Sequence, residues 1–310
     1  MRQSHRTARL AAFVAAVTLA GCWRADVYPI ASSALADGGS QDGEECPSFV
    51  LPPGDQNVTL QVGSVSRTFV LHIPQAHAAN TAVPLILDFH GIGGTGASER
   101  SASLFPAVTD SEGVIMAFPD GLKGPIGTAW NVGPCCVEGV DDLAFAKSIV
   151  AYVRGVACID ARRVYAVGVL TGGLMAYDLA CNAADTFAGV SPAAIDMVQE
   201  TVDACVPKRP VTIVSFRGTA DSHVPYAGGP SSLVPTMPLT FLGAKATFDW
   251  WAKVDGCSGA PSQEDSNGCA RYTACQGGAE VVLCTKQGGS DDPSDGVVAW
   301  PMLKRHTLGP

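Results

Sequence analysis

One short segment constrains the fold more than any other: RVYAVGVLTGGLMAY, residues 163–177. It begins with the apolar, strand-like run Val164–Val167 and ends in an apolar run of helical character. Between these runs lie Gly168 and Gly172, and glycine is favoured where the backbone turns sharply or approaches another segment closely. The segment therefore predicts a buried strand that bends tightly into a helix.

The same segment has the layout of a nucleophile elbow, G-x-S-x-G, in which a strained bend presents a serine. The residue between the two glycines is Leu170, whose side chain has no lone pair and no acidic proton. Thr171 follows, but a shift of one residue at such a bend would aim its side chain elsewhere. The sequence thus predicts an elbow that is kept as a structural turn without its nucleophile.

Strand and helix signals alternate along the rest of the chain. Strand-like apolar runs occupy residues 68–73, 84–89, 113–118, 211–216 and 280–285. Helical spacing occurs from 141 to 153, in the run after the elbow, from 244 to 254 and from 298 to 306. This alternation predicts an α/β fold with a mostly parallel central sheet and helices on both faces. With 310 residues the chain can bury one large core, and we expect residues 46–310 to form one domain.

The N-terminus has the features of an export signal. Residues 1–9 are basic and residues 10–20 are apolar, a run too short to span a bilayer. The small residues before Cys22 resemble a bacterial lipobox, which predicts a lipoprotein signal peptide over residues 1–22 with lipidation of Cys22. Residues 23–45 are small, polar and acidic, and they predict a flexible tether. We expect an extracytoplasmic protein anchored at the outer membrane or cell surface, the alternative being a plain secretory signal.

Ten cysteines remain after Cys22, an even number that favours disulfides in an exported chain. Their spacing contains no CxxC pair, which argues against zinc, and we expect neither a metal nor a cofactor. The connectivity cannot be derived from the sequence. We expect the adjacent Cys135 and Cys136 to have different partners, because an eight-membered vicinal ring is strained.

The net charge of −9 excludes one class of partner. Nucleic-acid binding requires a basic surface that neutralises phosphates, and no basic stripe occurs in this chain. We therefore expect no nucleic-acid partner, and contact with a membrane only through the lipid anchor.

From Cys46 to the C-terminus the sequence resembles the secreted polyhydroxybutyrate-depolymerase and feruloyl-esterase group of the α/β-hydrolases. The landmarks that carry the resemblance occur in family order: the loop 89–94, Trp130-Asn131, Cys135-Cys136, residues 140–142, the elbow, residues 218–226, residues 275–285 and residues 300–306. The resemblance implies an α/β-hydrolase fold stapled by disulfides. It also implies acyl transfer by a serine, a histidine and an acid, with backbone N–H groups holding the oxyanion.

The resemblance assigns roles to particular positions. Asp221 corresponds to the acid of the triad, and the backbone N–H groups of Ile92 and Thr171 correspond to the oxyanion hole. Arg217 stands where these enzymes commonly have a histidine before the Gly-Thr-Ala-Asp run. Asp291, or alternatively Ser290, stands where the catalytic histidine belongs. The resemblance therefore predicts a degenerate member of the family that keeps the acid but lacks both nucleophile and base.

A set of residues near the elbow is expected to line the former ester cleft: His90, Trp130 and Asn131. By analogy with the family, the expected ligand is a polyester, an aryl-sugar ester or a cell-wall polysaccharide. The first functional hypothesis is therefore an inactive, lipid-anchored protein that binds such a ligand through the cleft.

Two alternatives remain open on the sequence. The chain could be an active ester hydrolase with a displaced nucleophile, Thr171 or Ser290, and a displaced base such as His223. It could also be a purely structural envelope protein held by its lipid. His306 is the last histidine of the chain, and its helical context predicts a surface or packing role.

Overall fold

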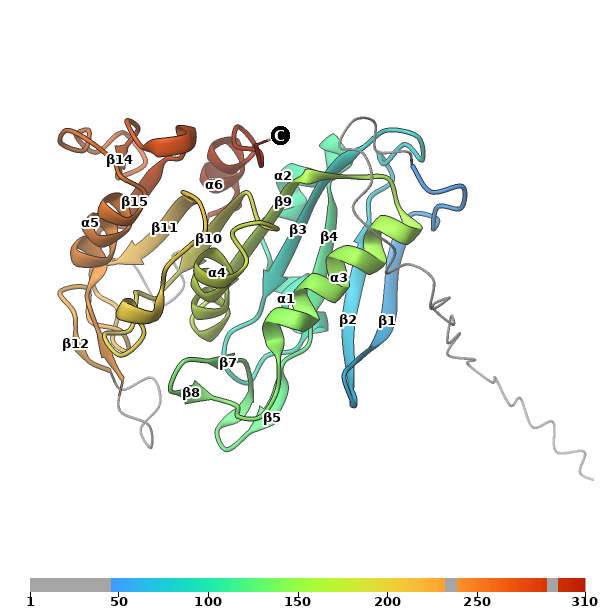
Figure 1. Ribbon diagram of the computed structural model, residues 1–310, viewed down its shortest axis with the longest axis horizontal. Helices are drawn as coiled ribbons and strands as arrows, with labels where there is room; N and C mark the ends of the chain where they lie inside the picture. Colours follow the sequence, from blue (N-terminus) through green and yellow to red (C-terminus); the bar gives the residue numbers. More distant parts are fainter. Residues whose placement is uncertain (1–45, 232–238, 289–294, 310) are drawn as a thin grey trace, which may run out of the picture. The chain divides into compact units, whose positions relative to one another are not determined.

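A nine-stranded sheet organises the protein (Figure 1). The computed structural model describes residues 46–231, 239–288 and 295–309. The predicted signal peptide with Cys22, the predicted tether, Ser290 and Asp291 lie outside the described residues. In spatial order the strands are β1 (Gly54–Val62), β2 (Val65–Ile73), β4 (Ile115–Pro119), β3 (Val83–Phe89), β9 (Ile159–Val169), β10 (Gly189–Ala193), β11 (Thr212–Gly218), β15 (Val281–Lys286) and β14 (Cys269–Tyr272).

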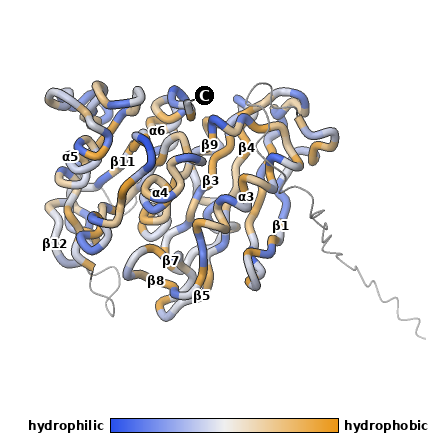
Figure 2. Tube along the Cα trace, viewed as in Figure 1, coloured by the Kyte–Doolittle hydropathy of each residue, from blue (hydrophilic) through white to orange (hydrophobic). Residues whose placement is uncertain are grey.

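The six strands from β4 to β15 are parallel to one another, and antiparallel pairs occur only toward the two edges of this sheet. Strands β3, β4, β10 and β11 are buried along their whole length, as expected for strands covered on both faces. In Figure 2 the central strands are coloured mostly as hydrophobic. The carboxyl ends of β3, β9, β10 and β11 consequently meet at one edge of the sheet, where they position the candidate site.

Helices cover both faces of the sheet, as predicted. One face carries α3 (Asp142–Val156), α4 (Thr171–Asn182) and α5 (Ala244–Val254), whose apolar residues join one core cluster. The other face carries α1 (Gly96–Ala102), α2 (Pro106–Thr109) and α6 (Gly296–Leu303) over a second core cluster. Alternate residues of each strand feed the two clusters: Leu85 and Leu87 face the first, and Ile86 faces the second.

Short elements complete the chain. Three two-stranded hairpins are β5 (Leu122–Gly124) with β6 (Gly127–Ala129), β7 (Asn131–Val132) with β8 (Cys135–Cys136), and β12 (Gly229–Pro230) with β13 (Thr240–Phe241). Three 3-10 turns, η1 to η3, span Asp110–Glu112, Val202–Ala204 and Gln276–Gly278. Within the described part of the chain, no helix combines the length and apolarity needed to cross a bilayer.

Five disulfides staple the fold, which confirms the expectation from the cysteine count. They pair Cys46 with Cys158, Cys135 with Cys136, Cys181 with Cys205, Cys257 with Cys275 and Cys269 with Cys284. The disulfides indicate an oxidising, extracytoplasmic environment.

The expectation that Cys135 and Cys136 have different partners is wrong. The two cysteines are bonded to each other within the β7–β8 hairpin, and both are buried. The peptide bond between them is cis, and their Cα atoms lie 3.1 Å apart.

Candidate active site

The elbow forms as the glycine pattern predicted. Leu170 lies between the last residue of β9 and the first residue of α4, with φ 52° and ψ −119°. Such a positive φ is uncommon for a residue other than glycine, and it is sustained here by surrounding contacts. The Leu170 N–H donates to the carbonyl of Ala193 (3.0 Å), and its carbonyl accepts from the N–H of Leu174 (3.1 Å). The bend is therefore fixed between β10 and the first turn of α4.

The elbow glycines are required by packing. A Cβ on Gly172 would overlap the carbonyl oxygen of Phe89, at the end of β3. A Cβ on Gly168 would lie 2.5 Å from the carbonyl oxygen of Gly172, and one on Gly173 would lie 2.6 Å from a methyl group of Ile195. These distances are shorter than any normal contact, so the turn and its neighbouring strands approach too closely for side chains. The elbow is retained for a structural reason that does not depend on a nucleophile.

The glycine-rich loop 90–94 faces the apex of the elbow. A Cβ built on Gly91 would lie 3.5 Å from both Cβ and Cδ1 of Leu170, so the leucine side chain lies beside this loop. The N–H groups of Ile92 and Thr171 donate to no acceptor among the described residues. Two backbone donors and a half-buried hydrocarbon side chain thus lie where the sequence placed an oxyanion hole and a nucleophile.

His90 and Trp130 support this loop from below. The imidazole Nδ1 donates to the carbonyl of Gly91 (2.7 Å), and Nε2 accepts from the N–H of Gly121 (2.9 Å). Since the first partner can only accept and the second can only donate, the ring is neutral, and burial lowers the pKa of His90 further. The indole Nε1 of Trp130 donates to the carbonyl of His90 (2.9 Å).

His90 and Trp130, which the sequence predicted to line the cleft, are buried, with exposed fractions of only 1% and 0%. The polar groups of Asn131 also form hydrogen bonds within the protein: its backbone N–H donates to Asp142 (2.7 Å), and its Nδ2 donates to the carbonyl of Val140 (2.8 Å). Asp142 in turn forms a buried ion pair with Arg67 at 2.6 Å. These residues hold the loops that shape the site and offer little surface to a ligand.

Both carboxylate oxygens of Asp221, the predicted acid of the triad, accept hydrogen bonds. Its Oδ1 accepts from the backbone N–H groups of His223 (2.9 Å) and Val224 (2.8 Å), while its Oδ2 accepts from Nη1 of Arg217 (3.0 Å). The carboxylate and the guanidinium are both completely buried. Arg217 therefore donates to Oδ2, while the backbone N–H groups donate to Oδ1 of Asp221.

Arg217 has a second carboxylate partner that the sequence did not reveal. Its Nε lies 3.2 Å from Oδ1 of Asp196, in the segment that follows β10, and its Nη2 donates to the carbonyl of Val224 (2.7 Å). Burial, with a smaller contribution from the charge of Asp221, raises the pKa of Asp196 to about 7 against the opposing effect of Arg217. One arginine therefore ties together two buried acids at the carboxyl ends of β10 and β11.

Among the described residues, neither His223 nor His306 is placed as a catalytic base for the elbow. His223 is exposed, and it is the backbone N–H of this residue that donates to Asp221. His306 is half-buried, and its Nε2 lies 3.8 Å from Oε1 of Glu280, which precedes β15 at the end of that strand remote from the elbow; this agrees with the predicted surface or packing role. Asp291, the residue at the expected base position, lies outside the described residues.

Thr171 is poorly placed to replace the missing serine. Its exposed fraction is 0%, and its hydroxyl is buried without a hydrogen-bond partner among the described residues. A hydroxyl becomes a nucleophile only when an adjacent base can take its proton. Ser290, the other displaced candidate, lies outside the described residues.

The amino-acid sequence of this chain is similar to those of proteins named feruloyl esterases. Feruloyl esterase B from Piromyces equi is 40% identical over 245 residues, which cover 78% of this chain and 46% of that protein. Feruloyl esterase D from Neurospora crassa is 25% identical over 256 residues, which cover 77% of this chain and 78% of that protein. The chain thus spans less than half the length of the first of these relatives. No protein-family model matches the chain.

A solved structure shares the fold. The acetyl xylan esterase from Aspergillus awamori superposes with a TM-score of 0.60 at 15% identity, covering 81% of this chain and 98% of that one. This likeness, together with the mostly parallel sheet, its helices on both faces and the disulfides, confirms the fold expected from the sequence.

Proposed function

This chain is a feruloyl esterase-like α/β-hydrolase, and on that premise we propose that it binds an esterified carbohydrate without hydrolysing it. The observation that carries the proposal is Leu170 at the apex of the elbow, with its hydrocarbon side chain beside Gly91. A leucine cannot attack a carbonyl carbon, so the first step of acyl transfer has no nucleophile at the apex.

The surroundings of Asp221 support the same conclusion. In a working triad the acid orients an imidazole, which then moves protons to and from the nucleophile. Here Arg217, a permanent cation, holds Asp221 instead. Loss of the serine or the histidine of a triad lowers turnover by roughly 10⁶, and loss of both adds little because the triad acts as a unit.

The proposed ligand class follows from the groups that remain at the elbow. The N–H groups of Ile92 and Thr171, which have no acceptor in the described part of the chain, can still donate to an ester carbonyl, and Leu170 can contact an acyl group. Relatives carry the names feruloyl esterase and acetylxylan esterase, which favours a feruloylated or acetylated polysaccharide over a polyester. We propose that such a polymer is retained at the cleft by its ester groups.

We also propose that the protein is a lipoprotein, exported by residues 1–22 and anchored at the outer membrane or cell surface through lipidated Cys22. The apolar run that ends in Leu19-Ala20-Gly21-Cys22 supports this, as do the disulfides. The test is a Cys22→Ser variant expressed in a bacterial host. The natural chain and the variant are compared by detergent phase partitioning. We expect the variant to move from the detergent phase to the aqueous phase, whereas an unchanged distribution would contradict lipid anchoring.

The absence of catalysis is tested with methyl ferulate and p-nitrophenyl acetate. We expect the natural chain, Leu170→Ser and Leu170→Ala all to hydrolyse both esters at the background rate, since a serine alone would have no base. The second candidate function is an active esterase that uses a displaced hydroxyl. Hydrolysis by the natural chain that Thr171→Val abolishes would favour that candidate and contradict ours.

Binding is tested by calorimetry with feruloylated arabinoxylan oligosaccharides and the same oligosaccharides after alkaline de-esterification. We expect the esterified form to bind more tightly and Leu170→Trp, which fills the cleft, to abolish the difference. Val206→Trp, at a residue that is 77% exposed, serves as the control. Equal binding of the two oligosaccharides would contradict the proposed role of the ester group.

A further inference from the structure

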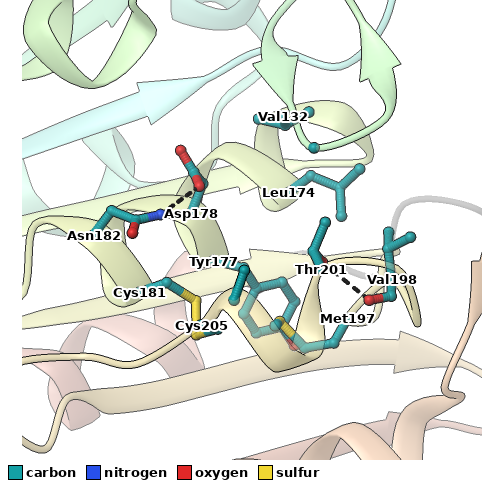
Figure 3. A pocket seen from close by; sticks show the side chains of 12 residues that line it. Val132, Leu174, Tyr177, Asp178, Cys181, Asn182, Met197, Val198, Thr201 and Cys205 are labelled. Carbon is teal, nitrogen blue, oxygen red and sulfur yellow. Dashed lines mark hydrogen bonds between the residues drawn. A yellow bond between two sulfur atoms is a disulfide. The ribbon is translucent and has the colours of Figure 1, made fainter.

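A cavity lies beside α4 (Figure 3). Its volume is about 190 Å³, and neither Leu170 nor the loop 90–94 contributes to it. The residues that line it are Val132, Gly133, Leu174, Tyr177, Asp178, Cys181, Asn182, Met197, Val198, Thr201, Ala204 and Cys205. The cavity is therefore a feature separate from the proposed ester cleft.

One face of α4 forms a wall of the cavity. Leu174, Tyr177, Asp178, Cys181 and Asn182 recur at intervals of three and four residues, which places them on the same side of the helix. The segment after β10 and the η2 turn form the facing wall, and the Cys181–Cys205 disulfide ties the two walls together. The disulfide fixes the width of the cavity at that end.

The lining is mostly apolar, and its carboxylate and amide groups are on one side. In Figure 3, Asp178 and Asn182 lie on one side of the cavity, and Leu174, Val198 and Met197 lie on the other. The ring of Tyr177 stacks on Trp251 with centroids 6.0 Å apart, which holds the base of the cavity rigid. A molecule bound here would meet hydrocarbon on most sides and a carboxylate on one.

The volume limits the ligand to one ring. An apolar protein cavity of about 150 Å³ takes up benzene, so 190 Å³ has room for a six-membered ring with a short substituent. Sites for larger, drug-sized molecules run from about 300 Å³ upward. An oligosaccharide chain does not fit.

The carboxylate of Asp178 determines which polar group a ligand of this cavity should carry. Its Oδ1 accepts from Nδ2 of Asn182 (2.8 Å), and no cationic side chain pairs with it anywhere in the described ranges. Burial raises the pKa of Asp178 to about 6, with smaller contributions from the charges of Asp142 and Asp141. At neutral pH the group is mostly ionised, and a half-buried carboxylate without a cation is an unfavourable arrangement that a ligand cation would relieve.

We propose that this cavity binds a small organic cation, a single apolar or aromatic ring that carries a protonated amine paired with Asp178. The ring fills the space between Leu174, Val198 and the disulfide, and the ammonium group donates to the carboxylate. This proposal goes beyond the function proposed above and does not depend on whether the elbow cleft binds esters.

The test uses benzylamine and its neutral analogue benzyl alcohol, titrated into the purified full-length chain and followed by calorimetry and protein-observed NMR. We expect benzylamine to bind more tightly than benzyl alcohol, with NMR shifts confined to residues around the cavity. Asp178→Asn, which keeps the shape and the bond to Asn182, should weaken benzylamine binding by roughly tenfold or more, since a hydrogen bond to a charged group contributes about 1.5–3 kcal/mol. It should change benzyl alcohol binding much less.

Two further variants make the result specific. Asp203→Asn removes an exposed carboxylate from the neighbouring η2 turn, outside the lining, and should leave benzylamine binding unchanged. Thr201→Phe fills the cavity without a change of charge and should abolish binding of both ligands. Failure of the natural chain to bind benzylamine, or binding that Asp178→Asn leaves within threefold of the original, would overturn the proposal.

Discussion

Arg217 donates from Nη1 to Oδ2 of Asp221 across 3.0 Å, and both side chains are completely buried. In a triad the same carboxylate would orient an imidazole that gains and loses a proton. A guanidinium does not release its proton in the accessible pH range. Paired with Arg217, the carboxylate of Asp221 therefore forms a structural ion pair and does not assist proton transfer.

The Arg217 ion pair predicts a large stability effect. Arg217→Met leaves Asp196 and Asp221 buried without a cation, and we expect it to lower the free energy of unfolding by roughly 3–5 kcal/mol. Urea denaturation at neutral pH measures this loss. As a control, Lys208→Met breaks an exposed pair with Asp185 and should cost at most about 1 kcal/mol. Equal losses in the two variants would refute the structural role of Arg217.

The elbow glycines predict a sharp contrast between two glycine-to-alanine changes. Gly172→Ala places a methyl group against the carbonyl of Phe89 and should destabilise the protein by about 3 kcal/mol or prevent folding. Gly155→Ala, near the end of α3, meets nothing within 4 Å and should leave stability unchanged or raise it by up to about 1 kcal/mol. Thermal unfolding of both variants checks this. A well-folded Gly172→Ala protein with an unchanged melting temperature would show that the close approach is not needed.

Asp255 predicts a decline of stability with rising pH. Burial raises the pKa of this side chain from 3.8 to about 7, against the opposing effects of the Val211 N–H and Arg209. Between these two pH values the folded state keeps a proton that the unfolded state has lost. The stability contributed by this proton is therefore fully present below about pH 4 and is lost as the pH rises toward 7.

Asp255→Asn removes that titration while keeping an oxygen for the N–H of Val211, which Oδ1 accepts at 3.1 Å. Across pH 4 to 7.5, the natural chain should lose roughly 4 kcal/mol more unfolding free energy than this variant. Denaturant titrations at several pH values measure the difference, with Asp203→Asn as an exposed control. Parallel curves for the natural chain and Asp255→Asn would rule out the assigned titration.

Asp178 predicts the pH dependence of the proposed amine site. Its pKa of about 6 means that the carboxylate needed by an ammonium ligand is present above pH 6 and lost below it. Between pH 7 and pH 5, benzylamine affinity should fall roughly tenfold in the natural chain. In Asp178→Asn the affinity should be nearly independent of pH over this range. A natural chain whose affinity stays constant from pH 7 to 5 would remove Asp178 from the recognition.

Much of the sheet could be predicted because its central strands are continuous apolar runs. Residues 84–89 fall within β3, residues 211–216 overlap β11 from Thr212 onward, and the predicted helix at 244–254 matches α5. Strands β1 and β10 gave no such signal. β1 is a partly exposed edge strand rich in polar residues, and β10 contains Pro192, which lacks the N–H that a central strand normally uses.

The candidate site was only partly predictable. The elbow and Asp221 could be located because their motifs are local in sequence. The partner Asp196 could not, since the ion pair with Arg217 arises only when β10 and β11 are adjacent in the sheet. The burial of Trp130 was not predictable for a related reason: a loop position says little about burial, and the indole donates to the carbonyl of His90 in the loop it supports.

The Cys46–Cys158 disulfide determines how mechanical tension would enter the protein. Cys158 immediately precedes β9, the strand that ends at the elbow, so force applied to the chain ahead of Cys46 passes through the sulfur–sulfur bond to the root of a central strand. The 111 residues between the two cysteines are excluded from the load path, as their separation of 112 implies. Pulling on the N-terminal end would therefore not peel the β1–β2 hairpin from the sheet until that bond is reduced.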